Sequence, residues 1–210
     1  MNVIRNDWWV TPVWEVQTDF DDKFNEQLLT EVNLYYTTKE GMNTVDSNIW
    51  TCDSPNILKL NKKILEIVKN LTHQYVAPNY DSFEYFHSKG WLNYNLSGQD
   101  LALHGHGGSK ISATYYISVP ENSGDLLLVD PRGGVDWDKE VENHVNGIKY
   151  KRIKPSKGKL IFFPSYVLHS VEQNKSNDVR ISLTTDISTV SPLTIKYFSD
   201  MIKKELQNVV

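Results

Sequence analysis

The chain has 210 residues, of which 40% are hydrophobic, so it can bury a substantial core, most economically as one domain. Its formal net charge of -4 offers no basic surface for nucleic acid, which leaves a small molecule or a peptide as the expected partner. The single cysteine, Cys52, cannot form an internal disulfide, and the first residues lack the apolar segment of a signal peptide. No apolar run approaches the roughly 20 residues that span a bilayer. These features predict a cytoplasmic protein and leave its oligomeric state open, a homodimer included.

The first part of the chain has the patterns of one short strand followed by two helices. Residues 9–16 are a strand candidate, and residues 21–36 have a weak helical spacing of apolar side chains. A stronger helix is expected to begin after Ser54, with Pro55 at its first position, and to stop before Pro78. Its apolar stripe consists of Ile57, Leu60, Ile64, Val68, Leu71 and Tyr75. The stripe is too apolar to face water, so this helix is expected to lie on the outer face of a sheet.

From Trp91 onward the pattern changes to short runs rich in β-branched and aromatic residues. Turns that contain proline and glycine, "SVPENSGD" and "KPSKG", separate some of these runs. The runs are residues 91–96, 101–104, 111–119, 125–129, 149–154, 159–163, 169–173 and 179–187. Eight short strands within about 100 residues predict an antiparallel sandwich or jelly roll. The chain is therefore expected to be mainly β with flanking helices.

We expect a single domain with three parts. Residues 1–90 are predicted to form a helical region packed on the barrel, residues 91–187 the barrel itself, and residues 188–210 a C-terminal helix. The segment 131–147 has neither a helical nor a strand period, so it is predicted to be a long loop. Loops of this length in a compact domain are often functional.

Six histidines are candidates for chemistry, and three of them have simple structural explanations. His73 lies near the end of the long helix, where a surface position or an interaction with the helix dipole is expected. His87 stands in the aromatic run "FEYFHSKGW" and is expected to form hydrogen bonds at the edge of the core. His144 lies in the long loop, where solvent exposure is expected.

The other three histidines lie in "LHGHGGSK" and "FFPSYVLHSV". His104 and His106 are two residues apart, a spacing that aims both side chains at the same face of a strand. Gly105 between them leaves room for an ion, although a polar turn is the simpler alternative and a metal site needs a third ligand. His169 begins a later strand and can face the pair across the mouth of a jelly roll, because strands far apart in sequence are neighbours there.

A further candidate for binding is Arg180, in "VRISLTTDI". Strand alternation puts Arg180 on the same face as Ser182, whereas the other face carries Val179, Ile181 and Leu183. An inward arginine is costly unless an anion pairs with it, and the alternative is an outward arginine on a solvated face. Beside a metal site, a guanidinium and a hydroxyl would suit a small dicarboxylate.

Two long stretches, "HGHGGSKISATYYISVPENSGDLLLVDPRGG" and "GKLIFFPSYVLHSVEQNKSNDVRISLTTDI", resemble a family of 2-oxoglutarate/iron(II)-dependent dioxygenases with a prolyl-hydroxylase-like fold. The resemblance is strong over residues 91–187 and weak in the front part, through "WVTPVW" and "DSNIW". It implies a double-stranded β-helix that binds Fe(II) as cofactor and 2-oxoglutarate as cosubstrate. The family is common in phage and marine bacteria, and a phage-encoded protein would act in the host cytoplasm.

The resemblance assigns His104 and His169 to the two metal histidines of the family. Most such enzymes complete the site with an aspartate or glutamate, whereas this chain has His106 at that position. The resemblance therefore implies one of two sites. Either all three histidines bind the metal, or His106 is not a ligand and the third position is open or filled by a remote carboxylate, for which Asp100 and Asp130 are the weaker candidates.

The same resemblance assigns Arg180 and Ser182 to the pair that holds the distal carboxylate of 2-oxoglutarate. Further contacts to the cosubstrate are expected from Asn93, Asn95 and one of the two tyrosines Tyr115 and Tyr116. The implied reaction is hydroxylation of a substrate with release of succinate and CO2. The loop 131–147, which contains Trp137, is expected to act as a lid over the substrate.

Two other functions fit part of the pattern. A cupin-like protein also holds a metal with histidines in a small β-barrel, but it has no need of Arg180 and Ser182. A jelly-roll binding module without catalytic activity would tolerate all three histidines as surface residues. Metal content separates the binding module from both metal-dependent alternatives.

Overall fold

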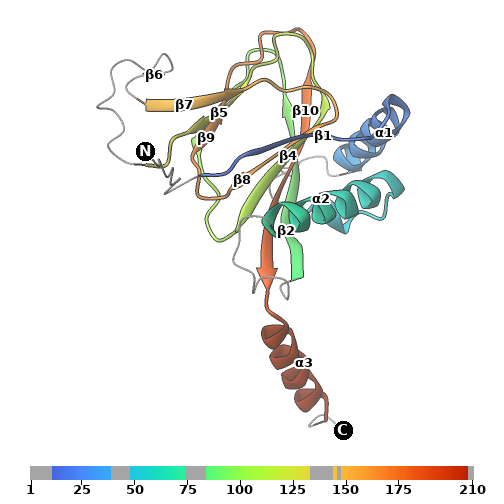
Figure 1. The fold of residues 1–210 in the computed structure, drawn as a ribbon. Helices are drawn as coiled ribbons and strands as arrows, with labels where there is room; N and C mark the ends of the chain where they lie inside the picture. The colour runs from blue at the N-terminus through green and yellow to red at the C-terminus, as the bar shows by residue number, and fades with distance from the viewer. Residues whose placement is uncertain (1–10, 39–47, 74–83, 133–143, 146–147, 208–210) are drawn as a thin grey trace, which may run out of the picture.

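The computed structural model describes residues 11–38, 48–73, 84–132, 144–145 and 148–207 (Figure 1). Within them, the strands form two five-stranded antiparallel sheets. The first sheet has the order β1-β8-β4-β10-β2, with β1 (Trp14–Gln17), β8 (Lys159–Pro164), β4 (Ile111–Ser118), β10 (Arg180–Val190) and β2 (Glu84–Asn95). The second has the order β3-β9-β5-β7-β6, with β3 (Leu101–His104), β9 (His169–Val171), β5 (Leu126–Val129), β7 (Ile148–Ile153) and β6 (His144–Val145).

This arrangement confirms the expected jelly roll, because strands distant in sequence pair across each sheet. Each of the eight predicted runs contains a strand, but two strands are longer than expected. Strand β2 begins at Glu84, and β10 continues to Val190, since these two strands pair along their whole length, with an irregularity between Asp186 and Ile187. The predicted strand in residues 9–16 is represented by β1, at Trp14–Gln17.

In the described part of the chain, four helical segments accompany the sheets: α1 (Asp22–Thr38), η2 (Ile49–Thr51), α2 (Pro55–His73) and α3 (Pro192–Gln207). The helices α1 and α2 lie beside the first sheet, whereas α3 extends away from the barrel (Figure 1). Leu193, Tyr197 and Phe198 of α3 are exposed. None of the helices among the described residues is long and apolar enough to cross a membrane.

Helix α2 packs on the first sheet as the apolar stripe predicts. Its Ile57, Leu60, Ile64 and Val68 are completely buried in one cluster with sheet residues such as Leu183. Leu71 packs against this cluster, and Tyr75 lies outside the described residues.

The beginning of α2 is stabilised by the neighbouring helix. The helix starts at Pro55, directly after Ser54, as the sequence predicts. The backbone N–H groups of Asn56 and Ile57 donate to the carboxylate of Glu31 in α1, at 3.0 and 3.1 Å. A carboxylate in this position satisfies free amides of the first turn and interacts favourably with the helix dipole.

A second cluster fills the space between the two sheets. It contains Tyr116, Ile161 and Phe163 from the first sheet and Leu126, Leu128 and Ile153 from the second. Strand β4 supplies both clusters by alternation, because Ala113 and Tyr115 face the helices while Tyr116 faces the second sheet. One face of the first sheet is therefore reserved for the helices, and the other is available to form a site inside the barrel.

Trp50 joins η2 to strands β2 and β10. Its indole Nε1 donates to Thr185 Oγ1 at 2.9 Å, and its ring stacks on His87 at 4.3 Å between centroids. The backbone of Gly90 passes directly below the indole, so a Cβ at this position would collide with Trp50 Nε1. The sequence contains a glycine here because the indole occupies the space of a side chain.

Of the three histidines with simple structural explanations, only His87 can be followed in full. His87 Nδ1 lies 2.8 Å from Thr185 Oγ1 and Nε2 lies 3.4 Å from Asn61 O, which confirms the expected hydrogen bonds at the edge of the core. His73 ends α2 and His144 begins β6, and their side chains lie outside the described part of the structure.

We predict that Gly90→Ala destabilises the fold by about 1–3 kcal/mol, because the indole of Trp50 must move and its hydrogen bond is strained. Thermal or urea unfolding measures the loss. Gly107→Ala is the matched control, since a Cβ at Gly107 meets nothing within 4 Å. Equal stability of the two variants would contradict the packing of Trp50 on Gly90.

A second prediction concerns stability in acid. Burial lowers the pKa of His87 from 6.5 to about 4, so the unfolded chain binds a proton at this residue before the folded chain does. The stability that neutral His87 contributes is complete above pH 6.5 and is lost as the pH falls towards 4. The loss should be on the order of 2 kcal/mol at pH 4 to 5. Urea unfolding of the native chain and His87→Gln from pH 7 to 4 should show a weaker acid dependence in the variant, and parallel curves would refute the assignment.

Candidate metal centre

A pocket lies inside the barrel, against the inner face of the first sheet. Strand β10 contributes Arg180, Ser182 and Thr184, three residues that share one face by alternation. The complete lining is Trp91, Asn93, Leu101, His104, His106, Thr114, Tyr116, Leu126, His169, Val171, Arg180, Ser182 and Thr184. Two wider surface grooves, which share Pro120 and Lys157, include no histidine among the described residues.

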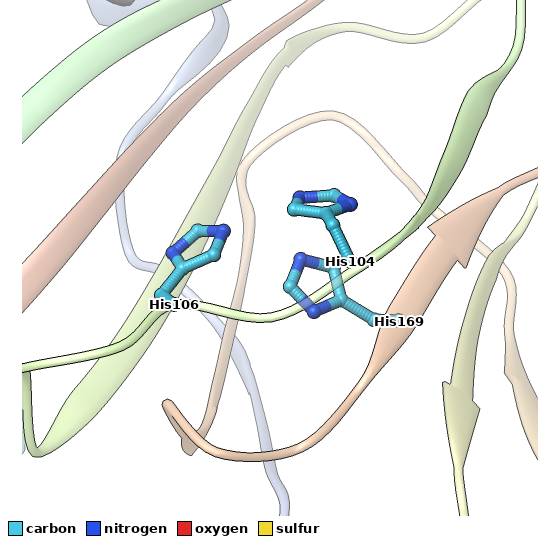
Figure 2. Close-up of side chains that lie close together, drawn as sticks. All are labelled: His104, His106 and His169. Carbon is cyan, nitrogen blue, oxygen red and sulfur yellow. The ribbon is translucent and has the colours of Figure 1, made fainter.

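Three histidines that line this pocket lie close together (Figure 2). One ligand atom from each of His104, His106 and His169 lies within 4.8 Å of the other two. The ring centroids are 4.2 Å apart for His104 and His169, 5.2 Å for His104 and His106, and 5.0 Å for His106 and His169. The described residues thus contain the three-histidine group that the sequence predicts.

The local structure explains how the three rings meet. His104 ends β3 and pairs in register with His169, the first residue of β9. His106 lies beyond the end of β3, not on it, and its backbone N–H donates to Ser165 O at 3.0 Å. Gly105 permits this close passage, because a Cβ there would lie 3.1 Å from Leu168 Cδ2. Strand pairing thus brings together the rings of His104 and His169, and the turn after β3 brings the ring of His106 to them.

Each of the three rings has an acceptor beside its Nδ1 atom. His104 Nδ1 lies 2.8 Å from Ala102 O, and His169 Nδ1 lies 3.1 Å from Val167 O. His106 Nδ1 lies 2.6 Å from Asp186 Oδ1. A proton on Nδ1 that is donated to these oxygens leaves the lone pair of Nε2 free, which is the tautomer that a metal requires.

Burial supports the neutral form of His169. It lowers the pKa of this residue from 6.5 to about 4. His169 is 5% exposed, so its ring lies in a setting that disfavours a charged imidazole. A neutral imidazole is the form that binds a metal ion.

Arg180 is a buried cation without an anionic partner among the described residues. Its Nη1 donates to Ser123 O and Gly124 O at 3.3 and 3.2 Å, and its Nη2 donates to Asn95 Oδ1 at 2.9 Å. Its Nε is buried and has no hydrogen-bond partner. Burial also lowers the pKa of Arg180 from its usual value. The side chain faces the pocket as predicted, with donor capacity that the described residues do not use.

The barrel was compared with known protein families. Residues 89–186 match the family described as "Putative 2OG-Fe(II) oxygenase". This description names the same Fe(II) and 2-oxoglutarate that the sequence resemblance implies. No curated protein matches the chain in sequence.

Solved structures share the fold of this chain at low sequence identity. The alpha ketoglutarate dependent epimerase SnoN from nogalamycin biosynthesis is 14% identical, with 84% of this chain and 76% of that chain covered and a TM-score of 0.61. A prolyl-4-hydroxylase from Pseudomonas putida is 13% identical over 84% and 86% of the two chains, with a TM-score of 0.57. HygX from Streptomyces hygroscopicus, solved with nickel and 2-oxoglutarate, is 14% identical over 85% and 82%, with a TM-score of 0.57.

The two candidate tyrosines lie on opposite faces of β4. Tyr116 lines the pocket, and burial raises the pKa of its hydroxyl to about 12, so it remains protonated. Tyr115 faces the helices, where its hydroxyl donates to Asn25 Oδ1 at 2.6 Å. Only Tyr116 is therefore brought to the pocket.

The two candidate asparagines have different positions relative to the pocket. Asn93 lines the pocket and donates to Thr184 Oγ1 at 2.8 Å. Asn95 is buried and contacts the guanidinium of Arg180, so it can orient this side chain. Ser182 is buried and lines the pocket beside them.

The alternative carboxylates lie away from the three histidines. Asp100 is exposed, and Asp130 accepts hydrogen bonds from Arg132. Neither aspartate lines the pocket. Of the expected lid 131–147, residues 133–143, which include Trp137, and 146–147 lie outside the described residues.

Several residues in and beside the pocket were not expected from the sequence. Trp91, Thr114 and Thr184 line the pocket, and Asp186 contacts His106. Thr184 and Asp186 follow Arg180 and Ser182 at intervals of two along β10, so the alternation that revealed the first pair extends to both. Trp91 and Thr114 carry no comparable signal, because aromatic and β-branched residues are common in every strand.

We predict that the three histidines form one metal site. Anaerobic addition of Co(II) or Ni(II) at about 100 times the Kd should stabilise the folded chain by about 2.7 kcal/mol, a rise in melting temperature on the order of 5–10 °C. His169→Ala should lose most of this rise. His87→Gln should keep it, because His87 lies on the helix side of the sheet. A full metal response in His169→Ala would contradict the site.

Proposed function

We propose that this protein is an oxygenase that holds Fe(II) with His104, His106 and His169, holds 2-oxoglutarate with Arg180, and hydroxylates a C–H bond of its substrate. The observation that carries the proposal is that one pocket contains both a three-histidine group and a buried arginine with an unused Nε donor. When bound, iron and 2-oxoglutarate together supply the oxidation of the substrate, and 2-oxoglutarate is converted to succinate and CO2.

Arg180 is suited to bind the distal carboxylate. A buried guanidinium is costly without a counter-charge, and a carboxylate supplies that charge together with two acceptor oxygens. Contacts with Asn95, Ser123 and Gly124 hold the side chain in place before any anion arrives. The preorganised arginine can thus fix the orientation of the cosubstrate with little loss of side-chain entropy.

Other side chains of the pocket complement the same anion. Ser182 and Thr184 follow Arg180 along β10, and Tyr116 faces it from β4. The hydroxyl of Tyr116 stays protonated well above neutral pH, so it can donate a hydrogen bond to a carboxylate. Asn93 can contribute a further polar contact from β2.

Apolar residues close the pocket around these polar groups. Leu126 and Val171 line it from the second sheet, and Trp91 lies beside His106 with 5.2 Å between ring centroids. Such walls exclude water, which strengthens the interaction of Arg180 with an anion and protects the reaction from side processes.

His106 is proposed as the third metal ligand, at the position where most related enzymes have an acid. Its ring lies close to both other rings, and its Nδ1 is engaged by Asp186. The ring is thereby held with Nε2 as the free nitrogen. The locations of Asp100 and Asp130 give no support to either of them as the third ligand.

The substrate is proposed to be a small molecule or a peptide. Among similar folds, a prolyl-4-hydroxylase is consistent with a peptide substrate, and an enzyme of nogalamycin biosynthesis is consistent with a small molecule. The free thiol of Cys52 is consistent with a reducing, cytoplasmic location. A cupin-like protein without cosubstrate is disfavoured, because it has no anionic ligand to pair with the buried charge of Arg180.

We predict that Arg180→Ala weakens 2-oxoglutarate binding by on the order of 2–4 kcal/mol, because a charge-assisted contact is lost. Arg180→Lys should recover only part of the affinity, since the planar fork is absent. Anaerobic titration of the Fe(II)-loaded chain, followed by the metal-to-ligand absorption band, measures the dissociation constant.

Arg152→Ala is the control for this titration. It removes the same charge from β7, where Arg152 pairs with Asp125 and Glu172 outside the pocket. Its affinity for 2-oxoglutarate should equal that of the native chain. Unchanged affinity in Arg180→Ala would refute the assignment of the cosubstrate site.

A further inference from the structure

Asp186 lies directly behind one of the three proposed ligands. Its Oδ1 is 2.6 Å from His106 Nδ1, and the two side chains are only 13% and 8% exposed. The other two proposed ligands have neutral backbone carbonyls at the same position, Ala102 O and Val167 O. His106 is therefore the one proposed ligand whose Nδ1 faces a carboxylate.

The carboxylate of Asp186 is held in place by buried groups. Ser112 Oγ donates to Asp186 Oδ1 at 2.8 Å, and it lies 3.0 Å from Ser165 Oγ. Both serines are completely buried. The backbone of Asp186 pairs with Ser112 and with Lys89, so strands on both sides fix it. The aspartate cannot easily turn away from His106.

The carboxylate of Asp186 adds a negative charge close to the proposed metal centre. Three imidazoles leave a divalent metal with its full charge, whereas two imidazoles and one carboxylate reduce it by one. A carboxylate that accepts the Nδ1 proton makes the imidazole a stronger donor and fixes its orientation. Asp186 can thus return, through the ring of His106, part of the negative charge that a ligand carboxylate would supply directly.

We propose that Asp186 is a positioning residue that orients His106 towards the metal and compensates the charge of a three-histidine centre. The inference rests on the proposed metal ligands. It assigns a role to a carboxylate that does not itself line the pocket, and it explains why a histidine can stand where an acid is usual.

The first test compares Asp186→Asn and Asp186→Ala in metal binding by the full chain. Asn keeps an acceptor oxygen and the shape of the side chain but loses the charge, whereas Ala loses both. We expect the Kd for Co(II) to rise 10–100-fold in Asp186→Ala and by a smaller factor in Asp186→Asn. Asp178→Asn removes an exposed carboxylate just before β10 and should bind Co(II) like the native chain.

The second test replaces the ring through which Asp186 acts. His106→Asp supplies a carboxylate ligand directly, so no imidazole remains for Asp186 to orient. Asp186→Asn should therefore weaken Co(II) binding by a smaller factor in the His106→Asp background than in the native background. Equal factors in the two backgrounds are expected if Asp186 only supports the fold.

A third measurement reports charge alone. The Fe(III)/Fe(II) potential of Asp186→Asn should lie above that of the native chain, because a negative charge near the metal stabilises Fe(III). Circular dichroism of the metal-free variants checks folding, and Asp186→Asn carries the test if Asp186→Ala does not fold.

The outcomes separate this inference from the proposed ligands. If His104→Ala and His169→Ala lose Co(II) binding while both Asp186 variants bind like the native chain, the role of Asp186 is wrong and the ligand set stands. Equal weakening of Co(II) binding by Asp186→Asn in both backgrounds would also overturn the inference. If His104→Ala and His169→Ala retain Co(II), the proposed metal site fails and the inference fails with it.

Discussion

Strand β10 must satisfy two environments at once, and the rest of the structure follows from this constraint. Its Ile181, Leu183 and Ile187 belong to the core shared with the helices. The other face carries Arg180 and the polar residues that follow it at intervals of two. Apolar side chains on one face require α1 and α2 as a cover, and a buried charge on the other face requires partners inside the barrel.

The polar face is stabilised in two different ways along its length. At the Arg180 end, backbone carbonyls and Asn95 satisfy part of the guanidinium, and its Nε is left as a donor for a ligand. At the Asp186 end, the carboxylate has found its partners within the protein, in His106 and Ser112. The guanidinium of Arg180 is thus available to an anion that enters the pocket, whereas the carboxylate of Asp186 pairs with His106 of the protein itself.

The position of the pocket between these ends has a consequence for the chemistry. A cosubstrate bound by Arg180 lies on the same strand face that leads to the histidines, so one rigid element relates the two binding functions. Sites on strands are held more precisely than sites on loops, and the reaction depends on correct orientation. The pairing of β10 with both β2 and β4 supplies this rigidity.

The sequence by itself determined the features that have a local period. Alternation predicted the inward face of Arg180 and Ser182, and the 3.6-residue stripe predicted the packing of α2, because each pattern is set by the geometry of one element. Contacts between elements were decided only by the tertiary structure. Alternation separates Tyr115 from Tyr116 but does not say which one faces the pocket, since that depends on which side of the sheet the helices cover. The hydrogen bond between His106 and Asp186 depends on the turn after β3 and on strand pairing between residues far apart in the chain, and no local pattern encodes either.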